Sequence, residues 1–204
     1  NWWYGYYKAD GITPLTDTNG DGYIDVDTLL PFDSTKIIVK VSPPQGIPAG
    51  VADTGIIRAM YARNGVDPIG RDSAFIITVC GLYFNIIVEP DTQGNGLPKD
   101  TLLFNLRVKN FGNFKDVINI DTSSNVSWQI EIFDMNNLPL YDHNGDGLPD
   151  IDSLPQGGIA GLKVKTILPD SLIAGTVGKI FVKGMYASFP SARDSAKIEI
   201  TVLE

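Results

Sequence analysis

The sequence predicts an all-β protein built from two tandem antiparallel β-sandwich domains, the first of which lacks its opening strands. Three observations predict this class: apolar and polar residues alternate along many short segments, turn-forming residues separate these segments, and the chain repeats itself. No segment of ten residues has convincing helical spacing.

The alternation has the period of two residues that is typical of strands. It is clearest in residues 101–109 (TLLFNLRVK) and 127–134 (SWQIEIFD), and Gly, Pro, Asn and Asp fill the gaps between such segments. The strands expected in the second half of the chain are 82–88, 101–109, 116–120, 127–134, 160–167, 179–187 and 195–203. Seven short strands separated by turns indicate an antiparallel β-sandwich.

The repeat emerges at an offset of 125 residues, where the second half of the chain matches the first. The matches include Trp3 with Trp128, DTNGDGYIDVD (17–27) with DHNGDGLPDID (142–152), MYA at 60–62 with MYA at 185–187, and, after a small gap, RDSA at 71–74 with RDSA at 193–196. The tripeptide ITV follows RDSA in both copies. The strands expected in the first copy are therefore only 2–8, 36–42, 56–62 and 73–80.

The two copies differ in completeness, since the first has no counterpart of residues 81–126. We expect an incomplete domain over residues 1–80 and a complete one over 81–204. Half a sandwich cannot bury its inner face, and an open edge strand invites pairing. We therefore expect the first domain to be completed either by strands inserted from another chain or by a missing N-terminal part.

Composition excludes several classes of function. The formal charge of −8 and the lack of clustered Lys or Arg argue against nucleic-acid binding. No apolar run approaches the roughly 20 residues that span a bilayer, so no membrane span is expected. Cys80 is the only cysteine, which rules out an internal disulfide and a Cys-based zinc site. The only histidine, His143, lies in an acidic loop, so we do not expect an enzyme.

Two copies of the motif D-x-N-x-D-G-x-x-D-x-D predict calcium sites, about two Ca²⁺ per chain. Hard divalent cations take several oxygen ligands, and alternate positions of a tight loop point at a common centre. The ligands expected in the first loop are Asp17, Asn19, Asp21, Asp25 and the Tyr23 carbonyl, with Asp27 as a further candidate. Those expected in the second are Asp142, Asn144, Asp146, Asp150 and the Leu148 carbonyl, with Asp152 as a further candidate.

The alternative reading of each loop is a polar turn without metal. It is disfavoured because four carboxylates would then crowd together without compensating charge. An EF-hand would close with Glu, but Thr28 and Ser153 stand at that position. A third stretch, DTQGNGLPKD at 91–100, has Lys99 near its end and is interpreted as a turn.

The second copy resembles a known family of domains. The residues that carry the resemblance are VKNFGNF (108–114), Asp116, Trp128, the acidic loop, Leu154-Pro155 with Gly157, and Ala174-Gly175-Thr176. This pattern is similar to the Ig-like domains associated with bacterial α-galactosidases, which occur as repeats in prokaryotic surface proteins. The resemblance implies tandem Ig-like antiparallel β-sandwich domains and an extracellular or cell-surface location.

We therefore expect a structural calcium-binding repeat protein of an extracellular filament, sheath or surface layer. Its partners would be copies of itself or neighbouring domains of a longer parent chain. The alternative is an accessory carbohydrate-binding or adhesin module, in which aromatic side chains stack on glycans.

The N-terminal segment NWWYGYY contains five aromatic residues in seven positions. By the repeat, Trp3, Gly5 and Tyr7 fall on core-facing residues of the second copy. The residues expected to face outward are Trp2, Tyr4 and Tyr6. Because the second copy has polar residues there, we expect these three to form an interface, with a sugar-binding stripe as the alternative.

Overall fold

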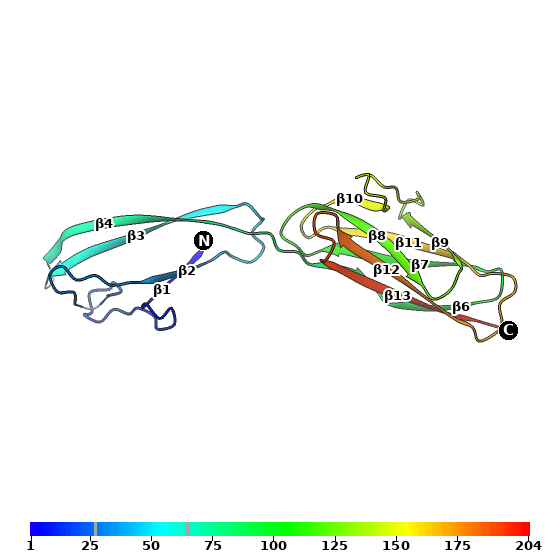
Figure 1. Ribbon diagram of the computed structural model, residues 1–204, viewed down its shortest axis with the longest axis horizontal. Helices are drawn as coiled ribbons and strands as arrows, with labels where there is room; N and C mark the ends of the chain where they lie inside the picture. The colour runs from blue at the N-terminus through cyan, green and yellow to red at the C-terminus, as the bar shows by residue number, and fades with distance from the viewer. Residues whose placement is uncertain (27, 64–65) are drawn as a thin grey trace. The chain divides into compact units, whose positions relative to one another are not determined.

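The computed structural model describes residues 1–26, 28–63 and 66–204, without the side chains of 62–69. The chain forms two compact units, Asn1–Gly81 (unit 1) and Leu82–Glu204 (unit 2) (Figure 1). Every regular element in the described part is a β-strand, so the prediction of an all-β fold is confirmed.

Unit 2 is a β-sandwich of two sheets. One sheet has the order β5-β7-β11-β9, and the other has the order β10-β8-β12-β13-β6. The strands are β5 (Ile86–Glu89), β6 (Thr92–Gly96), β7 (Thr101–Asn110), β8 (Asp116–Ser124), β9 (Gln129–Asp134), β10 (Asp150–Leu154), β11 (Ile159–Ile167), β12 (Val177–Tyr186) and β13 (Arg193–Val202). All neighbours are antiparallel except β13 and β6, which pair in parallel.

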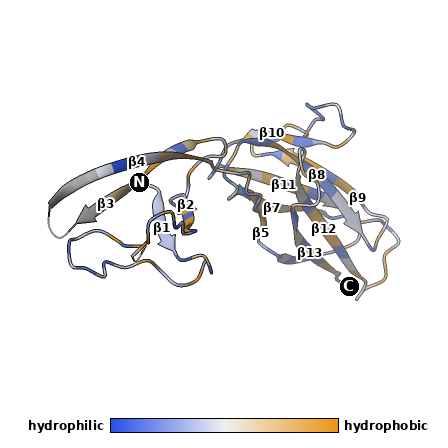
Figure 2. Ribbon diagram, turned by 60° about the vertical axis from the view of Figure 1, so that its left-hand side comes forward, coloured by the Kyte–Doolittle hydropathy of each residue, from blue (hydrophilic) through white to orange (hydrophobic). Residues whose placement is uncertain are grey.

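The core of unit 2 lies between the inner faces of the two sheets. Figure 2 shows apolar and polar residues alternating along its strands. The fully buried side chains of largest volume include Leu106, Ile118, Leu162, Ile180 and Ile198, each from a different strand. The alternation of period two in the sequence therefore predicts the core face correctly.

Two strands of unit 2 are absent from the prediction, β6 and β10. Residues 92–96 form an edge strand although 91–100 is predicted to be a turn, and only Leu97–Asp100 forms a turn. The glycines hide this strand in the sequence, because they contribute no side chain to the alternation. Gly94 is nonetheless required there, since an added Cβ would lie 2.9 Å from the ring of Phe104.

A buried polar cluster joins the two sheets of unit 2 at Asn110, the last residue of β7. Its side-chain nitrogen donates hydrogen bonds to the carbonyls of Phe114 and Leu154, each at 2.9 Å. Its side-chain oxygen accepts from Gly112 N at 2.9 Å and from the Tyr186 hydroxyl at 2.7 Å. All polar atoms of this buried amide are thereby satisfied.

The described residues of unit 1 form two antiparallel two-stranded sheets, β1-β2 and β3-β4. The strands are β1 (Trp3–Tyr7), β2 (Ile38–Ser42), β3 (Ala52–Arg63) and β4 (Val66–Val79). By the repeat they correspond, in this order, to β9, β11, β12 and β13 of unit 2. In unit 2 a second neighbour pairs with three of these strands: β7 pairs with β11, β8 with β12 and β6 with β13. Within the described residues, no strand pairs with the corresponding edges of β2, β3 and β4.

Strand β1 pairs with β2 one residue out of the register found in unit 2. Trp3 lies opposite Ser42, whereas Gln129 lies opposite Ile167, the residue equivalent to Ser42. A shift of one residue moves every side chain of a strand to the other face. Tyr4 and Tyr6 are consequently on the same face as their cross-strand neighbours in β2.

The prediction that Trp2, Tyr4 and Tyr6 face outward is therefore wrong. The Tyr4 ring packs against Gly55 of β3, and its hydroxyl donates to Asp53 Oδ2 at 2.7 Å. Trp2 and Tyr6 are also half-buried.

Trp3, Gly5 and Tyr7, predicted to face the core, occupy the opposite face. Trp3 is 53% exposed and its ring lies over Gly5, while Lys40 Nζ lies 4.4 Å from the centre of the Tyr7 ring. In unit 2 an aromatic ring also covers a glycine of the facing sheet, but the pair is Trp128 on Gly178. A ring of this strand thus lies against a glycine of the other sheet in both units, as Tyr4 on Gly55 and as Trp128 on Gly178, but the two pairs are not equivalent in the repeat.

Candidate metal centre

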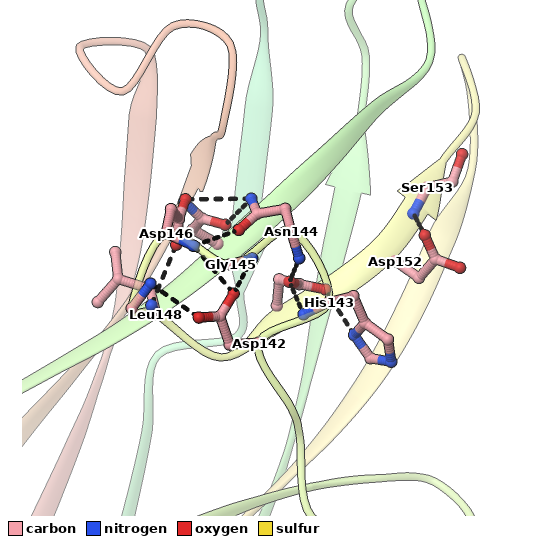
Figure 3. Close-up of polar contacts among 11 residues, drawn as sticks. Asp142, His143, Asn144, Gly145, Asp146, Leu148, Asp152 and Ser153 are labelled. Atoms are coloured by element: carbon pink, nitrogen blue, oxygen red, sulfur yellow. Dashed lines mark hydrogen bonds and ion pairs between the residues drawn. The ribbon is translucent and has the colours of Figure 1, made fainter.

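The second acidic loop is organised around the carboxylate of Asp142 (Figure 3). Asp142 accepts hydrogen bonds from Gly145 N at 2.6 Å, Asp146 N at 3.2 Å and Gly147 N at 2.8 Å. Gly145 and Gly147 have φ of 77° and 92°, a left-handed conformation in which glycine is favoured. These two glycines let successive N–H groups converge on one carboxylate.

A residue outside the motif, Asn119 of β8, supports this loop. Its buried side-chain nitrogen donates to Asp146 Oδ2, which also accepts from Asn144 Nδ2 at 3.0 Å. The Asn119 amide, followed by the Leu148 N–H and the Asn144 amide, holds the pKa of Asp146 below its ordinary value. The sequence motif does not predict the role of Asn119, because this residue reaches the loop only through the pairing of β8 with β10.

Asp150 anchors the end of the second loop as the first residue of β10. Its buried carboxylate accepts from His143 N at 2.7 Å and lies 2.9 Å from His143 Nδ1. Asp152 does not join this group: it is exposed, accepts from Ser153 N, and lies apart from the other acids in Figure 3.

The first loop repeats the same backbone arrangement. Asp17 accepts from Gly20 N at 2.7 Å and Gly22 N at 2.8 Å, as Asp142 does from the equivalent glycines. The N–H groups of Gly22 and Gly20, in that order, hold the pKa of Asp17 below its ordinary value.

The other predicted ligands of the first loop lie next to one another. Asn19 Nδ2 lies 3.2 Å from Asp21 Oδ2 and 3.4 Å from Asp25 Oδ1, and Tyr23 N donates to Asp21 Oδ1 at 2.9 Å. Hydrogen bonds from Thr18 hold the pKa of Asp25 below its ordinary value. The remaining predicted ligand, Asp27, lies outside the described residues.

The donor set of both loops fits a hard divalent cation. It contains only carboxylate, amide and carbonyl oxygens, and in the described chain no Lys or Arg forms a salt bridge with these carboxylates. Across 1–26, 28–63 and 66–204, no three Asp, Glu, His or Cys side chains surround a common point. The carboxylates instead accept hydrogen bonds from backbone N–H groups and from amide side chains.

We predict that Asp17, Asp25 and Asp146 lose their charge only at a lower pH than an ordinary aspartate does. The pKa values of Asp17, Asp25 and Asp146 are lowered in the folded chain, so their contribution to stability is present above the unfolded pKa of about 3.9. That contribution is lost as the pH falls through the lower folded values. In calcium-free NMR titrations the amide resonances of Gly20 and Gly22, which donate to Asp17, should therefore move with a midpoint below the ordinary Asp pKa. Movement centred on the ordinary Asp pKa would contradict this.

An exposed apolar strip lies on the outer face of β4 in unit 1. Phe75 and Ile77 are 67% and 71% exposed, and Val79 continues the strip. In the structure Ile76 is equivalent to Ile198, because Ile76 lies opposite Gly55 and Ile198 lies opposite Ile180, the residue equivalent to Gly55. The match of the ITV tripeptides in the sequence differs from this structural equivalence by one residue. The positions equivalent to the strip carry Lys197, Glu199 and Thr201.

The architecture of unit 2 is that of a two-sheet β-sandwich. No family model matches the sequence, and no curated protein sequence matches it. Domains 4 and 5 of the S-layer protein SbsC are similar in structure, with 13% identity, a TM-score of 0.33, and coverage of 74% of this chain and 77% of that chain. The C. elegans protein WR4, an MSP family member, has 13% identity, a TM-score of 0.34, and coverage of 59% of this chain and 99% of that chain.

Two further solved structures are also similar at this low level. AggA, the major subunit of aggregative adherence fimbriae type I from Escherichia coli, has 10% identity, a TM-score of 0.29, and coverage of 59% of this chain and 95% of that chain. A family 123 glycoside hydrolase from Clostridium perfringens is matched over 27% of its chain. Similarities at this level concern the β-sandwich fold alone. Among the described residues there is no helix with the length and hydropathy needed to cross a bilayer.

Proposed function

We propose that the chain is a structural calcium-binding repeat of a prokaryotic extracellular filament, sheath or surface layer. The observation that carries this proposal is the incompleteness of unit 1, whose described residues form four strands where unit 2 has nine. Its strand edges and its exposed β4 strip are the kind of surface that mediates contacts between domains. Neighbouring repeats or copies of the chain are the proposed partners.

Calcium would stabilise the two loops in this assembly. Asp17, Asn19, Asp21 and Asp25 would hold one ion, and Asp142, Asn144, Asp146 and Asp150 the other, with carbonyl oxygens completing each set. Two ions would reduce the formal charge from −8 to −4, since each carries two positive charges. Extracellular modules bind Ca²⁺ with dissociation constants of about 10⁻⁴–10⁻³ M, which suits a protein outside the cell.

The test is the state of association of the full chain with and without calcium. We expect sedimentation velocity and electron microscopy to show assemblies in millimolar CaCl₂, and smaller species after EGTA removes the ion. A chain that stays monomeric at all calcium concentrations, or assemblies that are indifferent to EGTA, would contradict the proposed role.

A second prediction concerns the apolar strip on β4. Replacing Phe75→Lys, Ile77→Glu and Val79→Thr introduces the residues of unit 2 and leaves the net charge unchanged. Because these side chains are exposed, unit 1 should keep its fold while self-association weakens severalfold by sedimentation. Leu103→Lys, at an exposed position of unit 2, is the control and should not change association. Unchanged association of the triple variant would exclude this strip as a contact surface.

A further inference from the structure

A tyrosine repeated in both units has opposite environments. Met60-Tyr61 of β3 and Met185-Tyr186 of β12 occupy equivalent positions in the repeat. Tyr186 is fully buried, whereas Tyr61 is 61% exposed; Met185 is 9% exposed and Met60 40%. Unit 1 therefore carries the residues of a buried site without the groups that bury it.

The groups that bury Tyr186 come from the part of unit 2 that has no counterpart in unit 1. The Tyr186 hydroxyl lies 2.8 Å from the Asn85 carbonyl and 2.7 Å from Asn110 Oδ1. The rings of Phe84 and Phe114 have centres 5.3 Å from the centre of its ring. All four residues belong to Leu82–Ser124, the segment that forms β5 to β8.

The same segment supports the acidic loop of unit 2. Asn119 of β8 donates to Asp146, and the Ile120 N–H donates to the Pro149 carbonyl at 2.8 Å. In unit 1, Asp21 is equivalent to Asp146 and accepts from Asn19 and Tyr23 N within its own loop. Two separate features of unit 1, Tyr61 and the first loop, thus correspond to contacts made by one segment.

We infer that unit 1 is completed by a polypeptide segment equivalent to Leu82–Asn125 that is joined directly ahead of β1. This deepens the proposed function and rests on it. In unit 2 Ile118 of β8 lies opposite Tyr186. The completing strand accordingly pairs with the open edge of β3, with its counterpart of Ile118 opposite Tyr61. Its counterpart of Asn110 accepts from the Tyr61 hydroxyl, and its counterpart of Asn119 donates to Asp21.

The connection in unit 2 favours a segment in the same polypeptide. β8 ends at Ser124 and β9 begins at Gln129, so a short link joins the completing segment to the strand equivalent to β1. Asn125 in this link bonds to β12 through Lys179 N at 2.6 Å. A segment that enters β1 in the same way is already beside the edge of β3.

The test is to fuse a copy of residues 82–125 to Asn1 of the full chain. Hydroxyl-radical footprinting of the monomer, with Tyr186 as the buried reference, should show that oxidation of Tyr61 falls severalfold. A graft carrying Asn110→Leu in the added copy should leave Tyr61 oxidised as in the ungrafted chain. Equal oxidation of Tyr61 with and without the unmodified graft would overturn the inference.

Two further measurements distinguish a failure of this inference from a failure of the proposed function. Equal protection of Tyr61 by the segment added as a separate peptide would overturn the assignment to the same polypeptide. Calcium-dependent assembly is measured on the ungrafted chain, so its failure overturns the proposed function without bearing on Tyr61. Assembly together with an unprotected Tyr61 overturns only the identity of the completing segment.

Discussion

Replacing Asn110 with alanine should destabilise unit 2 by about 4 kcal/mol. The substitution removes four hydrogen bonds and leaves the Phe114 and Leu154 carbonyls, the Gly112 N–H and the Tyr186 hydroxyl in a buried place without this partner. A buried polar group that loses its partner costs about 1–3 kcal/mol, so the sum exceeds the effect of most single substitutions. Hydrogen exchange of peptides from residues 82–204 in increasing urea would measure the loss.

The matched control is Asn136→Ala. Asn136 is also a hydrogen-bonded asparagine of unit 2, but it is exposed and bonds to Asp134 within a turn. Its loss should change the free energy of unfolding by no more than about 0.5 kcal/mol. Similar effects of the two substitutions would show that the Asn110 cluster does not hold the sheets together.

Much of this fold follows from the sequence because the side chains of a strand alternate. Residues 101–109 show the pattern without interruption, and the structure has β7 at Thr101–Asn110. Where glycine interrupts the alternation, as at Gly94 and Gly96 of β6, the strand is lost from the sequence pattern but still forms through backbone pairing. Periodicity detects buried side chains and cannot detect a strand whose inner positions are glycine.

Register is the property that the repeat could not provide. The alignment of Trp3 with Trp128 treats the two copies as superimposable, but one ring lies over Gly5 and the other over Gly178. The packing of Tyr4 on Gly55 selects a different register for β1, and all its side chains change face. Sequence similarity between repeats therefore predicts which strands form better than it predicts which way their residues point.

In the acidic loops, too, the sequence predicts the contacts between neighbouring residues but not those with distant residues. The carboxylate of Asp142 is bound by N–H groups within five residues of it, and such contacts follow from the spacing of Asp and Gly in the motif. Asn119 reaches Asp146 from 27 residues upstream, through the pairing of β8 with β10. No local pattern contains that contact, and unit 1 shows the same motif without it.

Calcium at a hundredfold excess over its dissociation constant should stabilise unit 2 by about 2.7 kcal/mol if it binds the native loop alone. For a unit of this size we expect the midpoint of thermal unfolding to rise by about 10 °C. Asp142→Ala should abolish this rise, because Asp142 accepts the N–H groups that shape the loop and is also a proposed ligand. Differential scanning calorimetry with CaCl₂ and with EGTA would measure the difference.

Asp152→Ala is the matched control, since it removes the same charge from the same motif. Asp152 lies apart from the other loop acids, so the calcium-dependent rise should persist in this variant (Figure 3). If the rise came only from general screening of the negative charge, both substitutions would reduce it equally. A full effect at Asp142 with none at Asp152 thus distinguishes coordination within the loop from screening, while equal effects would refute a site of this geometry.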